Sequence, residues 1–251
     1  MTDDITHDAF LGGRIRVWQP RKGYRAGVDP VLLAAATPAQ AGDTILELGC
    51  GVGTASLCLA ARVPGLSLTG VELQADYAAL AHRNAVENGV DMTVVTADIA
   101  TMPADLRQKQ FSFVIMNPPY FDRRSGTAAT DSGRDVAFGG DTPLPVWLDV
   151  GIKRIAAKGQ LVLIQRIERL PEVLDSLKGR LGSVIVCPIA GRTERAPELF
   201  LLKAQQDGRA PFRMTAPLVM HDGAAHDGDR ESYRPQIREV LRNGAALPVW
   251  S

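Results

Sequence analysis

The sequence lacks the features that mark several large classes of protein. Its three cysteines, Cys50, Cys58 and Cys187, form no CxxC pair, which argues against a disulfide framework or a zinc site and fits a reducing compartment. No apolar run is long enough to span a bilayer, and the first ten residues carry acids where a signal peptide carries basic residues. These absences predict a soluble, cytoplasmic protein that binds no metal and contacts no membrane.

An excess of charge of one sign is also lacking, because 28 basic and 28 acidic residues give a net charge of zero. A nucleic-acid-binding protein usually carries a basic excess, so the overall balance counts against such a partner. A local excess exists nevertheless, since five basic residues and no acid lie between residues 14 and 25: Arg14, Arg16, Arg21, Lys22 and Arg25. This segment is either a solvated loop or a local basic patch.

From about residue 43 onward, short apolar runs alternate with amphipathic stretches, a pattern typical of βαβ units on a parallel sheet. We expect seven strands, at 44–48, 66–73, 93–97, 111–116, 161–165, 184–187 and 198–203. We expect the intervening helices at 54–62, 75–88, 145–156 and 171–181. The sequence therefore predicts an α/β fold with a seven-stranded, doubly wound and mostly parallel sheet, Rossmann-like in its layout.

A single domain is expected to contain residues 1–251, and no internal repeat divides it. Residues 1–42 are interpreted as a basic segment and a helix that starts at Asp29-Pro30, with Asp as the N-cap and Pro as the first helical residue. Residues 43–205 are expected to form the core. Residues 206–251 are interpreted as an irregular cover that contains a short helix at 234–242.

A glycine-rich segment, Glu47-Leu48-Gly49-Cys50-Gly51-Val52-Gly53, joins the first expected core strand to the helix that follows. Ligands of open α/β sheets bind at the carboxyl ends of the strands, and glycines let the backbone approach them closely. The segment fits neither the dinucleotide pattern G-x-G-x-x-G nor a P-loop. Its pattern, E-x-G-x-G-x-G, resembles motif I of the class I methyltransferases, in which this loop wraps the amino-acid end of S-adenosylmethionine. The resemblance implies cofactor contacts at Glu47, Gly49, Gly51 and Gly53.

The next two strand ends each carry an acid. Glu72 ends the second strand, where a carboxylate can accept hydrogen bonds from both ribose hydroxyls of a nucleoside. Asp98 ends the third, where the resemblance places an acid that accepts from the adenine amino group. Either acid alone is equally compatible with a turn or a cap. Together with the glycine segment they predict S-adenosylmethionine as the cofactor, with Leu73 and Ile99 as neighbouring contacts.

The fourth strand ends in Asn117-Pro118-Pro119-Tyr120, which faces the methyl group of a cofactor held at the first strand. The lone pair of an exocyclic amine or an amide is delocalised, so two acceptors directed at its N–H bonds make the nitrogen more nucleophilic. The Asn117 side-chain oxygen and the Pro118 carbonyl are candidates, and the prolines restrict their backbone. Tyr120 offers a ring on which a flipped-out base can stack, a contact worth about 1–3 kcal/mol.

The tetrapeptide resembles motif IV of enzymes that methylate adenine N6, cytosine N4, guanine N2 or glutamine side-chain amides. The resemblance implies catalytic roles for Asn117, Pro118 and Tyr120, with Asn117 also next to the cofactor. It implies a planar conjugated nitrogen as the target without distinguishing a base from a glutamine.

Segments near both ends of the chain resemble one family. Residues 23–25 (GYR), 28–34 (VDPVLLA) and 217–222 (PLVMHD), together with Tyr233, are similar to bacterial tRNA adenine-N6 methyltransferases that act beside the anticodon of valine tRNA. The resemblance covers roughly residues 10–245 and implies RNA, with tRNA favoured, as the partner. It implies substrate contacts at Tyr24 and Arg25, and at Arg123 and Arg124 just after the NPPY segment.

Other substrates remain open. Glutamine methyltransferases of release factors share NPPY but carry a sizeable helical domain, for which the roughly 42 residues before the first core strand are too few. Guanine-N2 enzymes of ribosomal RNA commonly double the domain, and DNA adenine enzymes usually need a target-recognition region. A non-catalytic RNA-binding module would typically lose a loop glycine or the motif IV asparagine, and all four residues are present here. The sequence does not indicate the oligomeric state.

Overall fold

The computed structural model describes residues 4–120, 142–223 and 232–251. The strands of its main sheet are β3 (Thr44–Leu48), β4 (Ser67–Glu72), β5 (Met92–Thr96), β6 (Phe111–Met116), β7 (Ile155–Arg166), β8 (Leu181–Arg192), β9 (Leu199–Gln206), β10 (Arg213–Met214) and β11 (Leu218–His221). Their order is β10-β8-β9-β7-β6-β3-β4-β5, and β11 also pairs with β8. Only β9 runs antiparallel to its neighbours, so the sheet is mostly parallel, as the sequence predicts.

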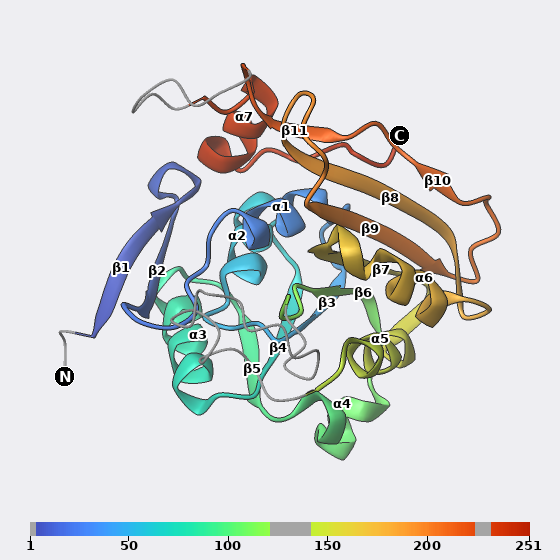
Figure 1. Ribbon diagram of the computed structural model, residues 1–251. Coiled ribbons are helices and arrows are strands. Elements are labelled where there is room, and N and C mark those ends of the chain that lie inside the picture. Colours follow the sequence, from blue (N-terminus) through green and yellow to red (C-terminus); the bar gives the residue numbers. More distant parts are fainter. Residues whose placement is uncertain (1–3, 121–141, 224–231) are drawn as a thin grey trace.

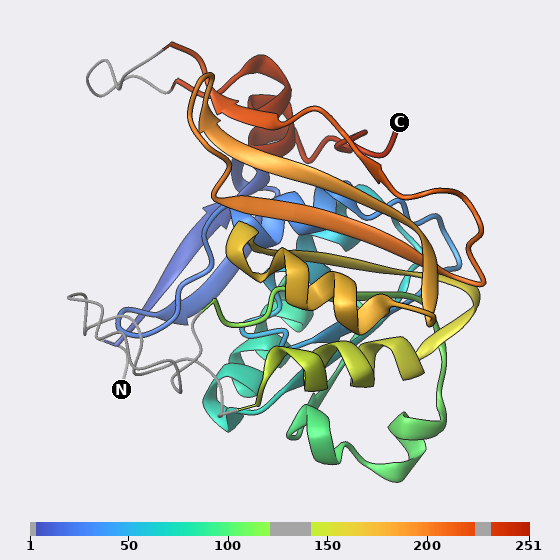
Figure 2. The same cartoon turned by 45° about the vertical axis from the view of Figure 1, so that its right-hand side comes forward.

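Helices cover both faces of this sheet (Figure 1). One face carries α1 (Asp29–Ala36), α2 (Thr54–Arg62), α3 (Ala75–Glu87) and α7 (Pro235–Asn243). The other carries α4 (Ala104–Gln108), α5 (Leu144–Lys153) and α6 (Leu170–Leu177), of which α5 and α6 lie side by side in Figure 2. Consecutive residues of a strand point to opposite faces, so Ile45 belongs to the first core cluster and Leu46 to the second. The core therefore has two layers, as a doubly wound α/β fold requires.

All seven expected strands and the helices between them are present, which confirms the predicted fold class. The expectation of an irregular carboxyl-terminal cover is wrong in part. Strands β10 and β11 extend the sheet beyond β8 to nine strands, and α7 packs against α1. Both strands have at most four residues, too few for an alternating pattern to be recognised in the sequence.

A hairpin of β1 (Ile5–Phe10) and β2 (Ile15–Pro20) precedes the core and was not expected from the sequence. Ile15 and Val17 are buried while Arg16 between them is exposed, which is the alternation of a half-buried strand. The hairpin forms its own small sheet and packs on α2 and α3, to the left in Figure 1. Short 3-10 turns complete the described elements: η1 (Leu11–Gly13), η2 (Ile99–Thr101) and η5 (Ile167–Arg169).

Two asparagines of α3 hold the hairpin in place. The Asn84 side chain is fully buried; it accepts from the Trp18 N–H at 2.8 Å and donates to the Trp18 carbonyl at 3.0 Å. It also donates to the Val52 carbonyl at 2.9 Å. One turn later, the partly exposed Asn88 makes the same paired contact with the backbone of Arg16. Asn84 thus joins the hairpin to the glycine-rich segment, whereas the Asn88 side chain contacts the hairpin and the Asn84 carbonyl of its own helix.

Other features concern the sequence-based exclusions. Cys50, Cys58 and Cys187 are all free and buried. No helix within residues 4–120, 142–223 and 232–251 is long and apolar enough to cross a membrane. The described part of the chain likewise contains no group of three His, Cys, Asp or Glu side chains that could hold a metal ion.

Replacing Asn84 with Ala is expected to lower the free energy of unfolding by about 2–4 kcal/mol, because each buried backbone group left without a partner costs about 1–3 kcal/mol. Asn88→Ala is the matched control: water can reach its partners, so the loss should be about 1 kcal/mol or less. Urea denaturation of both variants measures the difference. Equal losses would show that burial of the Asn84 contacts contributes nothing.

Candidate active site

The parallel register brings four strand ends to one edge of the sheet. Leu48 at the end of β3 pairs with Val71 of β4 on one side and with Met116 at the end of β6 on the other. Glu72, the last residue of β4, pairs with Thr96, the last residue of β5. The segments that leave these strands therefore start side by side. They contain all three sequence motifs, which the fold assembles into one site.

The glycine-rich segment turns sharply at this edge. Gly49, Gly51 and Gly53 have φ angles of 66°, 54° and 87°, a region that side chains other than glycine rarely adopt. A Cβ atom at Gly49 would lie 2.5 Å from the ring of Trp147, which is itself buried. The Cys50 N–H donates to the Val71 carbonyl at 3.0 Å and ties the turn to β4. Gly49 is therefore required both for its backbone conformation and for space.

The two predicted strand-end acids have well-defined partners. Glu72 is buried, and its two carboxylate oxygens accept from the N–H groups of Gly51 and Gln74, each at 2.9 Å. Each oxygen retains a second lone pair, so Glu72 can still accept from the two hydroxyls of a ribose. Asp98 caps η2 by accepting from the Ala100 N–H at 2.8 Å, and its other oxygen keeps its full accepting capacity.

The apolar residues next to these acids differ in exposure. The Leu73 side chain, which directly follows β4, is 41% exposed, unusual for a large apolar residue at that place, whereas Ile99 is buried. An exposed apolar side chain beside two strand-end carboxylates suits the face of an adenine ring. Together with the glycine turn, these groups fit an adenosyl cofactor. The individual contacts of Leu73, Ile99 and the acids with the cofactor remain predictions.

Glu47 lies deeper than expected for a ligand contact. It is buried, and one oxygen accepts from the Ser56 N–H at 3.0 Å and from the Ser56 hydroxyl at 2.5 Å, in the first turn of α2. Burial, aided by the nearby charge of Glu72, raises the pKa of Glu47 from 4.5 to about 7. Its observed role is to tie β3 to α2 across the glycine turn. Its predicted contact with the cofactor is not visible here and remains a prediction.

The NPPY segment follows β6, and neighbouring side chains contact its polar atoms. The Pro118 carbonyl accepts from Gln165 Nε2 at 3.3 Å, and Gln165 is fully buried at the end of β7. The Asn117 side chain lies beside the Tyr24 hydroxyl and lowers its pKa, against the rise that burial causes. Asn117 Oδ1, in contrast, is buried without a hydrogen-bond partner among the described residues. A buried acceptor without a donor is unfavourable by about 1–3 kcal/mol, which indicates that a ligand supplies the donor.

Tyr120 is held by Asp29, a residue for which a different role was expected. Its hydroxyl donates to Asp29 Oδ2 at 2.5 Å, and the Arg166 guanidinium lies over its ring, 5.6 Å from the centroid. Asp29 was expected to cap α1, but Val28 is the N-cap and makes no side-chain bond, so that expectation is wrong. Burial raises the pKa of Asp29, while the Tyr120 hydroxyl and Arg166 oppose the rise. The sequence signal that could have pointed to these contacts is a polar residue at the edge of an apolar run: Asp29 at the start of α1 and Gln165 near the end of β7.

The predicted substrate contacts lie in different surroundings. The Tyr24 ring lies over the glycine turn, 3.5 Å from where a Gly51 Cβ would be, and burial raises the pKa of its hydroxyl. Arg25 instead pairs with Asp8 at 2.8 Å and donates to the Pro20 carbonyl and the Thr6 hydroxyl. Its guanidinium therefore stabilises the hairpin, and contact with substrate remains a prediction. Arg123 and Arg124 lie outside the described residues.

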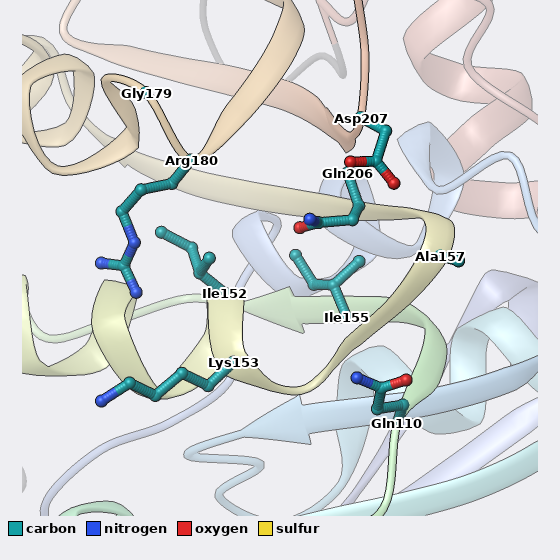
Figure 3. Close-up of a pocket in the computed structure, with 9 residues that line it drawn as sticks. All are labelled: Gln110, Ile152, Lys153, Ile155, Ala157, Gly179, Arg180, Gln206 and Asp207. Atoms are coloured by element: carbon teal, nitrogen blue, oxygen red, sulfur yellow. The ribbon is translucent and has the colours of Figure 1, made fainter.

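A hollow of about 490 Å³ lies at the opposite edge of the sheet from the motifs (Figure 3). It is lined by the end of α5, the start of β7 and the end of β9, with Lys153, Arg180 and Asp207 at its rim. None of the three sequence motifs reaches it, because they all follow the carboxyl ends of parallel strands. The candidate active site is therefore the edge of the sheet that carries the motifs.

Comparison with known proteins identifies the chain as similar to methyltransferases. The family model described as "Methyltransferase small domain" matches residues 27–132. A tRNA1(Val) (adenine(37)-N6)-methyltransferase of Yersinia enterocolitica is 32% identical over 200 residues, which cover 77% of this chain and 78% of that protein. A protein of the same name from a Flavobacteriaceae bacterium is 34% identical over 115 residues, only 48% of its length.

Among solved structures, a predicted O-methyltransferase from Agrobacterium tumefaciens superimposes with a TM-score of 0.68. The match covers 87% of this chain and 98% of that one at 24% identity, so it bears on the fold alone. It is consistent with the class I methyltransferase fold derived from the strand order. The fold and the relatives agree on S-adenosylmethionine as the cofactor.

The raised pKa of Glu47 predicts how stability depends on pH. The folded state binds the Glu47 proton more tightly than the unfolded chain, so this contribution is complete below pH 4.5 and is lost as the pH rises through about 7. In the wild-type protein, the unfolding free energy should fall by about 2–4 kcal/mol between pH 4.5 and 8 because of Glu47. In Glu47→Gln this fall should be absent. Urea denaturation at several pH values measures the slope.

Glu87→Gln serves as the control for this measurement. Hydrogen bonds from Arg83 and, second in size, from Trp18 lower the pKa of Glu87. The contribution of Glu87 to stability is therefore lost only below its ordinary pKa of 4.5. The wild-type slope between pH 5 and 8 should persist in Glu87→Gln. A slope that also persists in Glu47→Gln would show that Glu47 does not titrate in this range.

Proposed function

The chain belongs to the family of tRNA1(Val) (adenine(37)-N6)-methyltransferases, and from this premise we propose that it methylates the N6 atom of an adenine beside the anticodon of a tRNA. Its class I fold and its motif series match this activity, and its cofactor is S-adenosylmethionine. The names of its relatives support tRNA as the partner. The particular tRNA and nucleotide are part of the proposal.

The observation that carries the proposal is Asn117 Oδ1, which is buried and has no hydrogen-bond partner within residues 4–120, 142–223 and 232–251. An adenine amino group has two N–H donors and a lone pair delocalised into the ring. Accepting one N–H at Asn117 Oδ1 increases the electron density on the nitrogen and favours a pyramidal geometry, which reduces the overlap of its lone pair with the ring π-system. S-adenosylmethionine supplies an electrophilic methyl group when it is bound at the adjacent glycine turn. Tyr24, whose hydroxyl lies beside the Asn117 side chain, is the neighbour proposed to orient it for this task.

The Pro118 carbonyl is the proposed acceptor for the second N–H. It already accepts from Gln165, and its second lone pair is available to the substrate. Because Gln165 is fully buried and in turn accepts from the Arg166 N–H at 2.8 Å, the carbonyl is fixed before substrate arrives. Such preorganisation places the acceptors where charge develops in the transition state without reorganisation. The amino proton then leaves to water, so the site needs no strong general base.

A planar aromatic substrate is favoured over a glutamine by Tyr120. Its ring lies in the segment that carries Asn117 and Pro118, where a base held by the two acceptors can stack on it. A glutamine amide offers the same N–H donors but no ring to stack. This contact supports a nucleobase, and the relatives' names support adenine.

Methyl transfer from labelled S-adenosylmethionine tests the proposal directly. Bulk tRNA, ribosomal RNA and a release factor are offered separately, and labelled RNA is digested to nucleosides. We expect N6-methyladenosine from tRNA as the main product. Label on the release factor, or recovered as methylguanosine, would reject the substrate while retaining the cofactor assignment.

Asn117→Ala tests the proposed acceptor. Removal of one preorganised hydrogen-bonding group typically lowers kcat by about 100- to 1,000-fold, and we expect a loss of this size. Asn117→Asp keeps an acceptor at the same place and should retain part of the activity. Affinity for S-adenosylhomocysteine, measured by calorimetry, should change little in either variant. Asn243→Ala, on the distant α7, is the control, and full turnover by Asn117→Ala would refute the mechanism.

A further inference from the structure

Three elements that are distant in the sequence meet at the Tyr120 side chain. Asp29 belongs to the first turn of α1, Tyr120 follows β6, and Arg166 ends β7. The Tyr120 hydroxyl donates to the Asp29 carboxylate, and the Arg166 guanidinium lies over the Tyr120 ring. All three side chains are partly buried at the edge of the sheet that carries the motifs. None of these contacts follows from the motifs themselves.

We propose that Asp29 is a positioning residue for methyl transfer, which fixes the Tyr120 ring in the orientation that the target base requires. This inference rests on the proposed function, in which the Tyr120 ring stacks on the base. Asp29 itself does not touch the base or the cofactor in this role. It acts through the hydroxyl at the far end of the tyrosine side chain.

The geometry of the bond explains why it restricts the ring. The distance between Tyr120 Oη and Asp29 Oδ2 is 2.5 Å, within the short range of an O–H donor and a carboxylate, which forms stronger hydrogen bonds than a neutral acceptor. The other end of the side chain is restricted by the two prolines that precede it. A tyrosine has two rotatable side-chain bonds, and anchoring both ends removes rotation about them. The ring is therefore oriented before a base arrives.

The support behind Asp29 is rigid. Leu32 and Leu33 of α1 are buried, with exposed fractions of 1% and 0%. The last turn of α1 is tied to the end of the chain: the Ala35 carbonyl accepts from the Leu247 N–H at 2.8 Å, and the Ala36 carbonyl from Trp250 Nε1 at 2.6 Å. Side chains on such fixed elements hold a site more accurately than side chains on loops. Asp29 thus transmits the position of α1 to Tyr120.

Arg166 defines which side of the ring remains for the base. Its guanidinium carbon lies 5.6 Å from the ring centroid, so one face of Tyr120 is occupied by the protein. Its positive charge also attracts the Asp29 carboxylate, which favours the ionised acceptor. A stacked base is accordingly left with the opposite face. Asp29 and Arg166 together specify both the tilt and the accessible face of the platform.

A double-mutant cycle tests whether Asp29 acts through Tyr120. Asp29→Ala and Tyr120→Phe each remove one side of the bond, and each should lower kcat/KM by about tenfold to a hundredfold, with unchanged affinity for S-adenosylhomocysteine. The kcat/KM of the double variant should be no lower than that of the less active single variant. Asp29→Asn keeps an acceptor oxygen and should restore most of the lost activity. Asp149→Ala, which removes a paired carboxylate on α5, should leave kcat/KM within about twofold.

The outcome is separable from that of the proposed function. The cycle is measured with whichever acceptor the wild-type protein methylates, so a different substrate would reject only the earlier proposal. Wild-type kcat/KM in Asp29→Ala, or full additivity with Tyr120→Phe, would overturn the role of Asp29. Melting temperatures identify any variant that fails to fold.

A second measurement does not depend on turnover. In a crystal structure of Asp29→Ala, the Tyr120 ring should leave its wild-type orientation or lose its electron density, while the backbone of α1 and β6 stays in place. An ordered Tyr120 ring in the wild-type orientation would equally overturn the proposal.

Discussion

The parallel register of β3, β4, β5 and β6 is the constraint on which the rest of the site depends. Pairing of Leu48 with Met116, and of Glu72 with Thr96, ends these strands at a common level. Adjacent strands lie about 4.8 Å apart, so groups after different strands come within reach of one small molecule. A glycine turn, two carboxylates and the NPPY segment, which span 74 residues from Glu47 to Tyr120, therefore meet at one edge of the sheet. A register shift of one residue would reverse the inward and outward faces of a strand and separate them.

The segments outside the core complete this edge. Tyr24 and Asp29 come from the chain before β3, and they contact Asn117 and Tyr120 respectively. The last residues of the chain brace α1 from behind through Leu247 and Trp250. The NPPY segment is thus held by residues that precede β3 in the chain and, on its β7 side, by Gln165. What distinguishes this chain from a bare cofactor-binding fold is this support.

The sequence predicted the elements whose pattern is local. The core strands alternate or form short apolar runs, and the glycine, acid and NPPY motifs stand at their ends, so both the fold class and the candidate residues could be identified. Asp29-Pro30 is equally clear as a helix start, but nothing local reveals a tyrosine partner 91 residues later. The pairing of Arg25 with Asp8 likewise depends on how the hairpin folds, so the basic segment alone does not reveal that Arg25 has an acidic partner. Side-chain contacts between residues far apart in the chain cannot be predicted from a single sequence.

The shared use of Asn84 has a dynamic consequence. One amide nitrogen serves the Val52 carbonyl in the glycine turn and the Trp18 carbonyl in the hairpin. Any opening that detaches the hairpin must give up contacts that also define the turn. A molecule bound by the turn is therefore thermodynamically linked to the closed hairpin and lowers the population of its open form. Amide protons of β2 should then report occupancy of a site that they do not touch, through slower exchange with solvent.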